Sequence, residues 1–142
     1  MSDWKSRFPL LPPWLPTLAE AMVHIAMTKG NNPVPMREAG RRAGAEPRYL
    51  EKYQAALVAH GILKGKRGPN GGFLLARSPS TITVGDLYRI WLDQLKFDED
   101  PWPRSEFGAK MEQVFRLAET RMIAELDAVT IDDLMNTVLT NG

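Results

Sequence analysis

The 142-residue sequence contains no cysteine, and this absence removes several kinds of chemistry at once. Without a thiol, the chain cannot form disulfide bonds, thiolate zinc sites or cysteine-ligated iron–sulfur clusters, and it has no cysteine nucleophile. The sequence also lacks an apolar run of the roughly 18 residues that a membrane-spanning helix needs. Residues 1–7 lack the apolar core and cleavage site of a signal peptide, so we expect a cytoplasmic protein without membrane contact.

Patterns typical of catalysis and metal binding are missing as well. The sequence has no nucleophile elbow, no paired catalytic carboxylates and no glycine-rich loop that opens a helix, because the stretch 68–72 joins two expected strands. The two histidines, His24 and His60, have no further ligand at a metal-binding spacing, and His60 suits the negative end of a helix. The sequence therefore predicts neither an enzyme nor a bound metal or cofactor.

Charge is distributed unevenly along the chain. The net charge of +1 conceals 12 Lys/Arg and 5 Asp/Glu in residues 1–77, against 6 Lys/Arg and 12 Asp/Glu in residues 78–142. A basic first half is typical of a unit that meets a polyanion, and an acidic second half indicates a different task. Two solvated faces of a single domain would give the same totals, so charge alone does not decide. The acidic run 98–100 is interpreted as a solvated loop.

Hydrophobic periodicity and turn residues predict a series of short elements. Thr17 with Glu20, and Thr83 with Asp86, have the spacing of capping residues at the start of a helix, and Thr130 can cap a last one. The expected elements are, in order, helices at 17–29, 35–43 and 47–60, strands at 62–66 and 73–77, and helices at 83–92, 105–128 and from 130 onward. The segment 96–104 is expected to be a loop.

The order of these elements is that of a winged helix-turn-helix. A short helix, a turn at Gly44, a second helix ending at Gly61 and a two-stranded hairpin follow one another. Such a second helix fits the major groove of DNA, about 12 Å wide, while the hairpin tip can reach the minor groove. The predicted fold is mainly α-helical with a small β-hairpin wing. We divide the chain into an N-terminal arm (1–16), a winged helix-turn-helix DNA-binding domain (17–92), a loop (93–104) and a dimerisation helix with a short C-terminal helix (105–142).

Basic and polar side chains occur where such a fold meets DNA. Arg41 and Arg42 on the supporting helix can contact phosphates, and Arg48 lies in the first turn of the recognition helix. Glu51 has two open interpretations: it accepts a hydrogen bond from a cytosine amine, or it pairs with Arg48 or with the helix dipole. The residues expected to bind DNA are Arg37, Arg41, Arg48, Tyr49, Glu51, Lys52, Lys64, Lys66, Arg67, Gly68, Pro69, Asn70 and Gly71.

Several of these motifs together resemble one family of bacterial regulators. Tyr49-Leu50-Glu51 in the recognition helix is followed by the wing stretch 67–76, RGPNGGFLLA, and then by ITVGDL at 82–87. In this combination the sequence is similar to the winged-helix family typified by the iron–sulfur cluster regulator IscR and the nitric oxide sensor NsrR. The resemblance covers roughly residues 18–92 and, more loosely, the long helix. It implies a homodimer in which that helix crosses its mate, with Arg48, Glu51 and Arg67 at base-contacting positions.

The sequence departs from this family in two places. Many relatives bind an iron–sulfur cluster through three cysteines in the loop before the long helix, whereas the corresponding loop near 96–104 has none. Cluster sensing by that route is therefore not expected. In addition, an arm rich in proline precedes the first helix, where relatives usually begin directly.

The long helix carries an apolar stripe with spacings of three and four residues. It is long for an ordinary core helix, and nothing after it is large enough to cover both of its sides. We therefore predict a dimer interface formed by Met111, Phe115, Ala118, Met122 and Leu126.

The four tryptophans are many for a chain of this length. Tryptophans usually fix loops to a core, but Trp14, Trp91 and Trp102 are also candidates for lining a small-molecule pocket.

Three functional hypotheses follow from these observations. The first is a homodimeric regulator, most simply a repressor, that binds double-stranded DNA at a pseudo-palindromic operator. The second is a winged-helix module that binds another protein. The third is a regulator whose DNA affinity is set by a small-molecule effector in the tryptophan-lined pocket.

Overall fold

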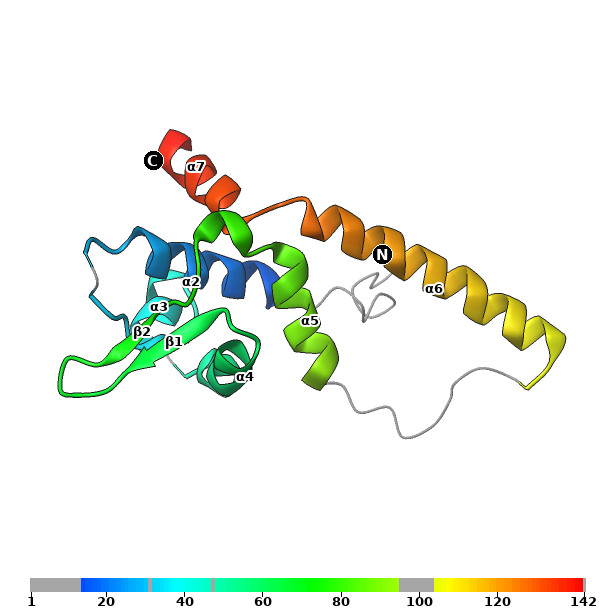
Figure 1. Ribbon diagram of the computed structural model, residues 1–142, viewed down its shortest axis with the longest axis horizontal. Coiled ribbons are helices and arrows are strands. Elements are labelled where there is room, and N and C mark those ends of the chain that lie inside the picture. The colour runs from blue at the N-terminus through cyan, green and yellow to red at the C-terminus, as the bar shows by residue number, and fades with distance from the viewer. Residues whose placement is uncertain (1–13, 31, 47, 95–103, 142) are drawn as a thin grey trace.

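The computed structural model describes residues 14–30, 32–46, 48–94 and 104–141. A body of short helices and one hairpin carries a single long helix that extends away from it (Figure 1). The prediction of a mainly helical fold with a small β-hairpin wing is confirmed. Most of the expected arm and of the expected loop at 96–104 lies outside the described residues.

The first described helix, α2 (Leu15–Met27), begins two residues earlier than predicted, and its predicted capping box is not formed. Trp14 occupies the N-cap position, and a proline stands in the first turn, where no backbone N–H is needed. Glu20 instead places a carboxylate oxygen 3.6 Å from Nε2 of His24. Because Trp14 and Leu15 are both buried, packing of apolar side chains moves the start of the helix ahead of Thr17.

The supporting helix agrees with its prediction, whereas the recognition helix does not. Helix α3 (Met36–Arg42) is preceded by Pro35, close to the expected bounds. The prediction of one continuous helix over 47–60 is wrong: a turn at 48–50 leads into the 3-10 helix η1 (Glu51–Tyr53) and then into α4 (Gln54–Ala59).

Hydrogen bonding and burial explain that difference. The backbone N–H of Tyr53 donates to the carbonyl of Leu50 at 3.0 Å, a bond that spans three residues instead of four. Leu50, Tyr53 and Leu57 are all buried. Residues three apart share a face in both kinds of helix, so apolar spacing could not distinguish them. Gly61, with φ of 72°, ends α4 as expected.

The wing is an antiparallel hairpin of β1 (Leu63–Lys66) and β2 (Gly72–Leu75). Phe73 also exchanges backbone hydrogen bonds of 2.9 and 2.8 Å with Val34, in the linker before α3. A Cβ at Gly72 would lie 2.5 Å from the Val34 carbonyl carbon and 2.6 Å from the Pro35 nitrogen. Only glycine permits this approach, which ties the start of β2, next to the turn of the hairpin, to the linker before the supporting helix.

Three helices complete the chain: α5 (Val84–Gln94), α6 (Glu106–Asp127) and α7 (Ile131–Asn141). The predicted capping pattern at Thr83 and Asp86 is confirmed by reciprocal bonds of 3.0 and 2.9 Å, and Thr130 forms a similar pair with Asp133. Helix α6 packs on α5, and α7 packs on α2, with Ile131 fully buried in the core. No helix in the described ranges combines the length and apolarity needed to span a bilayer.

Candidate nucleic-acid interface

The supporting helix α3 holds two of its arginines through one carboxylate. Glu38 accepts hydrogen bonds from Arg41 at 2.9 and 2.6 Å and from Arg42 at 3.0 Å. These bonds, that from Arg41 foremost, lower the pKa of Glu38 to about 2. The carboxylate therefore stays ionised at any physiological pH and orients both guanidinium groups on the exposed side of α3. The predicted phosphate contact Arg41 thus has a defined position before any ligand arrives.

The supporting helix and the recognition segment meet at an ion pair. Arg37 Nε lies 3.5 Å from Glu51 Oε1, and both side chains are solvent-accessible. Of the interpretations left open for Glu51, the structure shows a salt bridge, but its partner is Arg37 and not Arg48. The guanidinium of Arg48 has no acidic partner among the described residues, and its exposed side chain is available to an external anion.

Aromatic rings support the remaining cation of the recognition segment. The Lys52 ammonium lies 5.3 Å from the ring centroid of Tyr49 and 5.2 Å from that of Tyr53. Tyr53 is buried, and its ring stacks on Trp14 with 4.4 Å between centroids. The core thereby fixes the base on which Lys52 rests, while Tyr49 stays partly exposed beside it.

The wing presents exposed cations around a tight turn. Lys64, Lys66 and Arg67 are exposed, and within the described part of the chain none of them forms an ion pair. The N–H of Gly71 donates to the carbonyl of Gly68 at 2.9 Å and closes the tip of the hairpin. The tip borders an open hollow of about 530 Å³ lined by Asn32, Pro33, Lys66, Arg67, Gly68, Pro69 and Asn70.

These elements lie along one side of the body. In Figure 1 the hairpin and α4 are at the lower left, whereas α6 and α7 occupy the upper side. The structure thus brings the predicted recognition segment and wing to a common side and separates them from the predicted dimerisation helix. A group of exposed cations of this kind can neutralise several phosphates of a duplex at once.

Helix α6 exposes apolar side chains that the sequence prediction only partly identified. Of the predicted stripe, Phe115 and Ala118 are exposed, whereas Met111, Met122 and Leu126 are half-buried, and the last two pack against the core. Three further residues are strongly exposed: Phe107 at 70%, Val114 at 48% and Leu117 at 53%. Phe107 and Val114 are seven residues apart and so share a face of a helix. This spacing can be read from the sequence.

The tryptophans lie in different surroundings. Trp14 is buried in the stack on Tyr53, and half-buried Trp91 has its ring 5.6 Å from that of Tyr88; Trp102 lies outside the described residues. Burial raises the pKa of Tyr88 to about 12, with a smaller contribution from the charge of Glu119. Its hydroxyl has no hydrogen-bond partner among the described residues. A ligand pocket lined by the tryptophans stays a prediction.

Comparison with known proteins assigns this architecture to a family. The model of the Rrf2 family, described as "Iron-dependent Transcriptional regulator", matches residues 17–137. The transcriptional regulator IscR of Sodalis glossinidius is 40% identical over 65 residues, which are 46% of this chain and 39% of that protein. IscR of Klebsiella pneumoniae is 36% identical over 67 residues, 47% of this chain and 41% of its own. The match therefore spans about two fifths of the length of these curated relatives.

Solved structures extend the similarity over nearly the whole chain. IscR of T. potens is 29% identical, covers 90% of this chain and 87% of its own, and superposes with a TM-score of 0.67. CymR, described as the global cysteine regulator of B. subtilis, is 26% identical, covers 96% of both chains and gives a TM-score of 0.59.

The donor set of this chain does not fit a cluster held by three cysteines. The sequence has no cysteine, and the described residues contain no group of three histidine, aspartate or glutamate side chains able to hold a metal ion. The family description, which refers to iron, thus disagrees with the side chains available in this chain to bind metal. No iron chemistry can be derived from these residues. The fold and the motif spacing nevertheless agree with the family match over residues 17–137, and the chain belongs to the Rrf2 family of transcriptional regulators.

Proposed function

We propose that this protein is a homodimeric transcriptional repressor that binds a pseudo-palindromic DNA operator without an iron–sulfur cluster. The observation that carries the proposal is the set of exposed cations on the recognition segment and wing, Arg48, Lys52, Lys64, Lys66 and Arg67. In Figure 1 the hairpin and α4 lie on the same side of the body. The charges of these cations are not matched by neighbouring carboxylates in the described part of the chain. A partner rich in phosphate would satisfy them all.

Base contacts are assigned to the residues that are best placed and least engaged. Arg48, at the start of the recognition segment, and Arg67, at the wing tip, have long exposed side chains suited to the major and the minor groove respectively. Glu51 would accept from a cytosine amine after exchanging its 3.5 Å contact with Arg37. Arg41, held by Glu38, would contact a phosphate and set the register on the duplex.

The exposed apolar face of α6 supports the homodimer. Phe107, Val114, Phe115 and Leu117 are each about half or more exposed on a helix that extends away from the body (Figure 1). Contiguous exposed apolar surface marks an interaction site, and a second copy brings an identical stripe about a two-fold axis. Two copies joined through α6 would present two reading units to two half-sites, which explains the expected pseudo-palindrome.

The proposal includes repression and a cytoplasmic location. A dimer bound across two half-sites covers roughly two turns of duplex and blocks its use by polymerase without further contacts. Bacterial DNA lies in the cytoplasm, so this partner places the protein there. Because the chain has no cysteine, a signal would have to act through another chemistry.

A small-molecule effector is a second candidate, favoured by the surroundings of Tyr88. Its hydroxyl is buried without a partner among the described residues, next to half-buried Trp91. A ligand acceptor near this ring would satisfy the hydroxyl and change the fluorescence of Trp91. Titration of metabolite pools against tryptophan emission tests this, and a flat response removes the candidate.

The main proposal is tested by mixing the purified protein with fragments of its own genome at about physiological salt and sequencing the retained DNA. We expect a recurrent inverted repeat and an affinity that falls steeply with salt concentration. The matched control is the double variant Arg48→Ala, Arg67→Ala, which should lose the enrichment while remaining folded. Absence of any enriched sequence would contradict the proposal, and salt-independent capture of another protein would favour an interaction module.

A further inference from the structure

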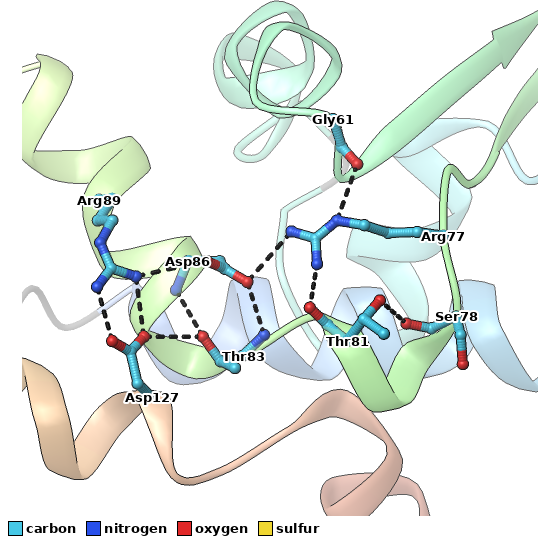
Figure 2. Close-up of polar contacts among 8 residues, drawn as sticks. All are labelled: Gly61, Arg77, Ser78, Thr81, Thr83, Asp86, Arg89 and Asp127. Atoms are coloured by element: carbon cyan, nitrogen blue, oxygen red, sulfur yellow. Dashed lines mark hydrogen bonds and ion pairs between the residues drawn. The ribbon is translucent and has the colours of Figure 1, made fainter.

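A chain of polar contacts crosses the molecule from the end of the recognition segment to the end of α6 (Figure 2). Arg77, just after β2, is its centre on the DNA-binding side. Arg77 Nε donates to the carbonyl of Gly61 at 3.3 Å, Nη1 donates to the carbonyl of Thr81, and Nη2 donates to Asp86 Oδ2 at 3.2 Å. One side chain therefore holds the end of α4, the base of the wing, the helix η2 (Pro79–Thr81) and the start of α5.

The second part of the chain joins α5 to α6. Arg89 donates two hydrogen bonds to the carboxylate of Asp127, at 2.8 and 2.6 Å, and a longer one to Asp86 at 3.4 Å. Thr83 Oγ1 also donates to Asp127, at 3.0 Å. Asp127 is the last residue of α6, so this planar arginine–carboxylate pair fixes where the long helix leaves the body.

Backbone contacts make this junction tight. The N–H of Val84 donates to the carbonyl of Val129 at 2.9 Å, and Ile131 donates to the carbonyl of Ile82 at 2.8 Å. A Cβ built at buried Gly85 would lie 2.7 Å from Cγ of Asp127 and 3.1 Å from its nitrogen. The glycine thus allows α6 to end directly against the first turn of α5, and little freedom remains between the two helices.

The network has two properties that a simple stability contact lacks. Asp86 is shared: one carboxylate oxygen accepts from Arg77 and the other accepts from Arg89. The end of α4 and the end of α6 are therefore both linked to the same carboxylate. In addition, Arg77 follows directly on the wing. The other described polar tie from α4 to α5, His60 Nε2 at 2.7 Å from Asp93, involves neither the wing nor Asp86.

We infer that Arg77 is a positioning residue that sets the separation of the two DNA-reading units in the dimer, and hence the half-site spacing that the protein accepts. The inference rests on the proposed function. In a dimer joined through α6, the distance between the two recognition segments depends on the angle between α4 and α6 in each copy. Arg77, through Asp86, Arg89 and Asp127, fixes that angle. Each base pair added between half-sites moves them about 3.4 Å apart and rotates one about the axis, so a rigid dimer discriminates sharply.

A distance measurement tests this without DNA. The cysteine-free sequence allows a single spin label at Ala55→Cys, an exposed position on α4 outside the residues proposed to bind DNA. Dipolar spectroscopy on the dimer should give a narrow distance distribution in the parent, and a clearly broader one with Arg77→Gln. Arg42→Gln, which removes an exposed arginine pair with Glu38 on α3, away from the proposed dimer interface, is the matched control and should leave the width unchanged. Equal widths for the parent and Arg77→Gln would overturn the inference.

Operator variants give the functional test. Affinity is measured on the selected operator and on versions with one or two base pairs inserted between the half-sites. The parent should lose about tenfold or more per inserted pair, which is about 1.4 kcal/mol, whereas Arg77→Gln should bind all spacings within a few-fold. Arg77→Lys, which keeps the charge but replaces three donor nitrogens by one, should lie between them.

The outcomes separate the inference from the function beneath it. If the parent binds no DNA or gives no dipolar signal, the proposed function fails and the inference falls with it. If the parent discriminates spacings and Arg77→Gln discriminates equally, only the inference fails. Circular dichroism checks that each variant is folded. Should Arg77→Gln not fold, Asp127→Asn loosens the same network from the α6 side and must show the same loss of spacing preference.

Discussion

The wing and the α5–α6 junction are both rich in charge, yet they use it in opposite ways. In the wing, Lys64, Lys66 and Arg67 are exposed and carry no ion pair within the described residues. At the junction, Arg89 is bound to the carboxylates of Asp86 and Asp127, and its hydrogen bonds to Asp127 raise the pKa of its guanidinium. The wing charges that the described fold leaves unpaired are available to an external partner, whereas the paired charges at the junction hold the elements in place. The exposed apolar face of α6 belongs with the wing in this respect.

The largest effect is expected from a charge on the α6 face. Leu117→Glu would place a carboxylate in the proposed dimer interface, and a buried unpaired charge costs about 3–5 kcal/mol. Analytical ultracentrifugation should show a monomer with unchanged helicity. The matched control is Leu139→Glu on α7, where a leucine is similarly exposed at 63%. If both variants remain dimeric, Leu117 does not lie in the dimer interface.

At the junction we expect a change in folding and not in binding alone. Gly85→Ala would force a methyl group against Asp127 and push α5 from α6, a case of overpacking that we place at about 3 kcal/mol. Gly65→Ala is the comparison, since its Cβ would meet only Phe73 at an ordinary 3.7 Å. Thermal unfolding measures both. Equal melting temperatures for Gly85→Ala and the parent would mean that the junction yields easily.

In the wing, the expected effect is on binding with little change in folding. Arg67→Ala should weaken operator binding by about 1–3 kcal/mol if the side chain contacts a base, and the melting temperature should stay near that of the parent. Fluorescence anisotropy on operator and on random DNA measures both losses. An equal loss on both DNAs would show that Arg67 contacts only phosphate.

The smallest effect concerns pH. Hydrogen bonds from Arg89 lower the pKa of Asp127 in the folded protein below its ordinary value of 3.8. As the pH falls past that value, the unfolded chain takes up a proton before the folded one does, so this stabilisation is present at neutral pH and is lost in acid. Because the pair is partly exposed, we expect less than about 1 kcal/mol. Urea unfolding of Asp127→Asn should differ from the parent at pH 7, and the difference should shrink as the pH falls below about 4.

Most of the fold could be predicted because its signals are local. Thr83 with Asp86 marked the start of α5 by the spacing of a hydroxyl and a carboxylate, and Gly61 marked the end of α4. The 3-10 turn at Glu51–Tyr53 could not be predicted, because its apolar spacing is the same as that of an α-helix.

The sequence predicted which residues belong to the candidate site, but not which of them form ion pairs with one another. The basic residues of the wing follow from their place around the glycine turn. That Glu51 meets Arg37 depends on how two helices pack, and neither residue signals the other in the sequence. Phe107 and Leu117 escaped the predicted stripe because spacing alone does not say which side of α6 rests on α5.

The sequence by itself determined the order of the elements, the charge of the wing and the exclusion of cysteine chemistry, because each depends on residue type and near neighbours alone. Only the tertiary structure decided that Arg77, Asp86, Arg89 and Asp127 form one network between recognition segment and long helix. These residues lie up to 50 positions apart, and what joins them is the close approach of two helices that Gly85 allows. Contacts of that range depend on packing, which no local pattern encodes.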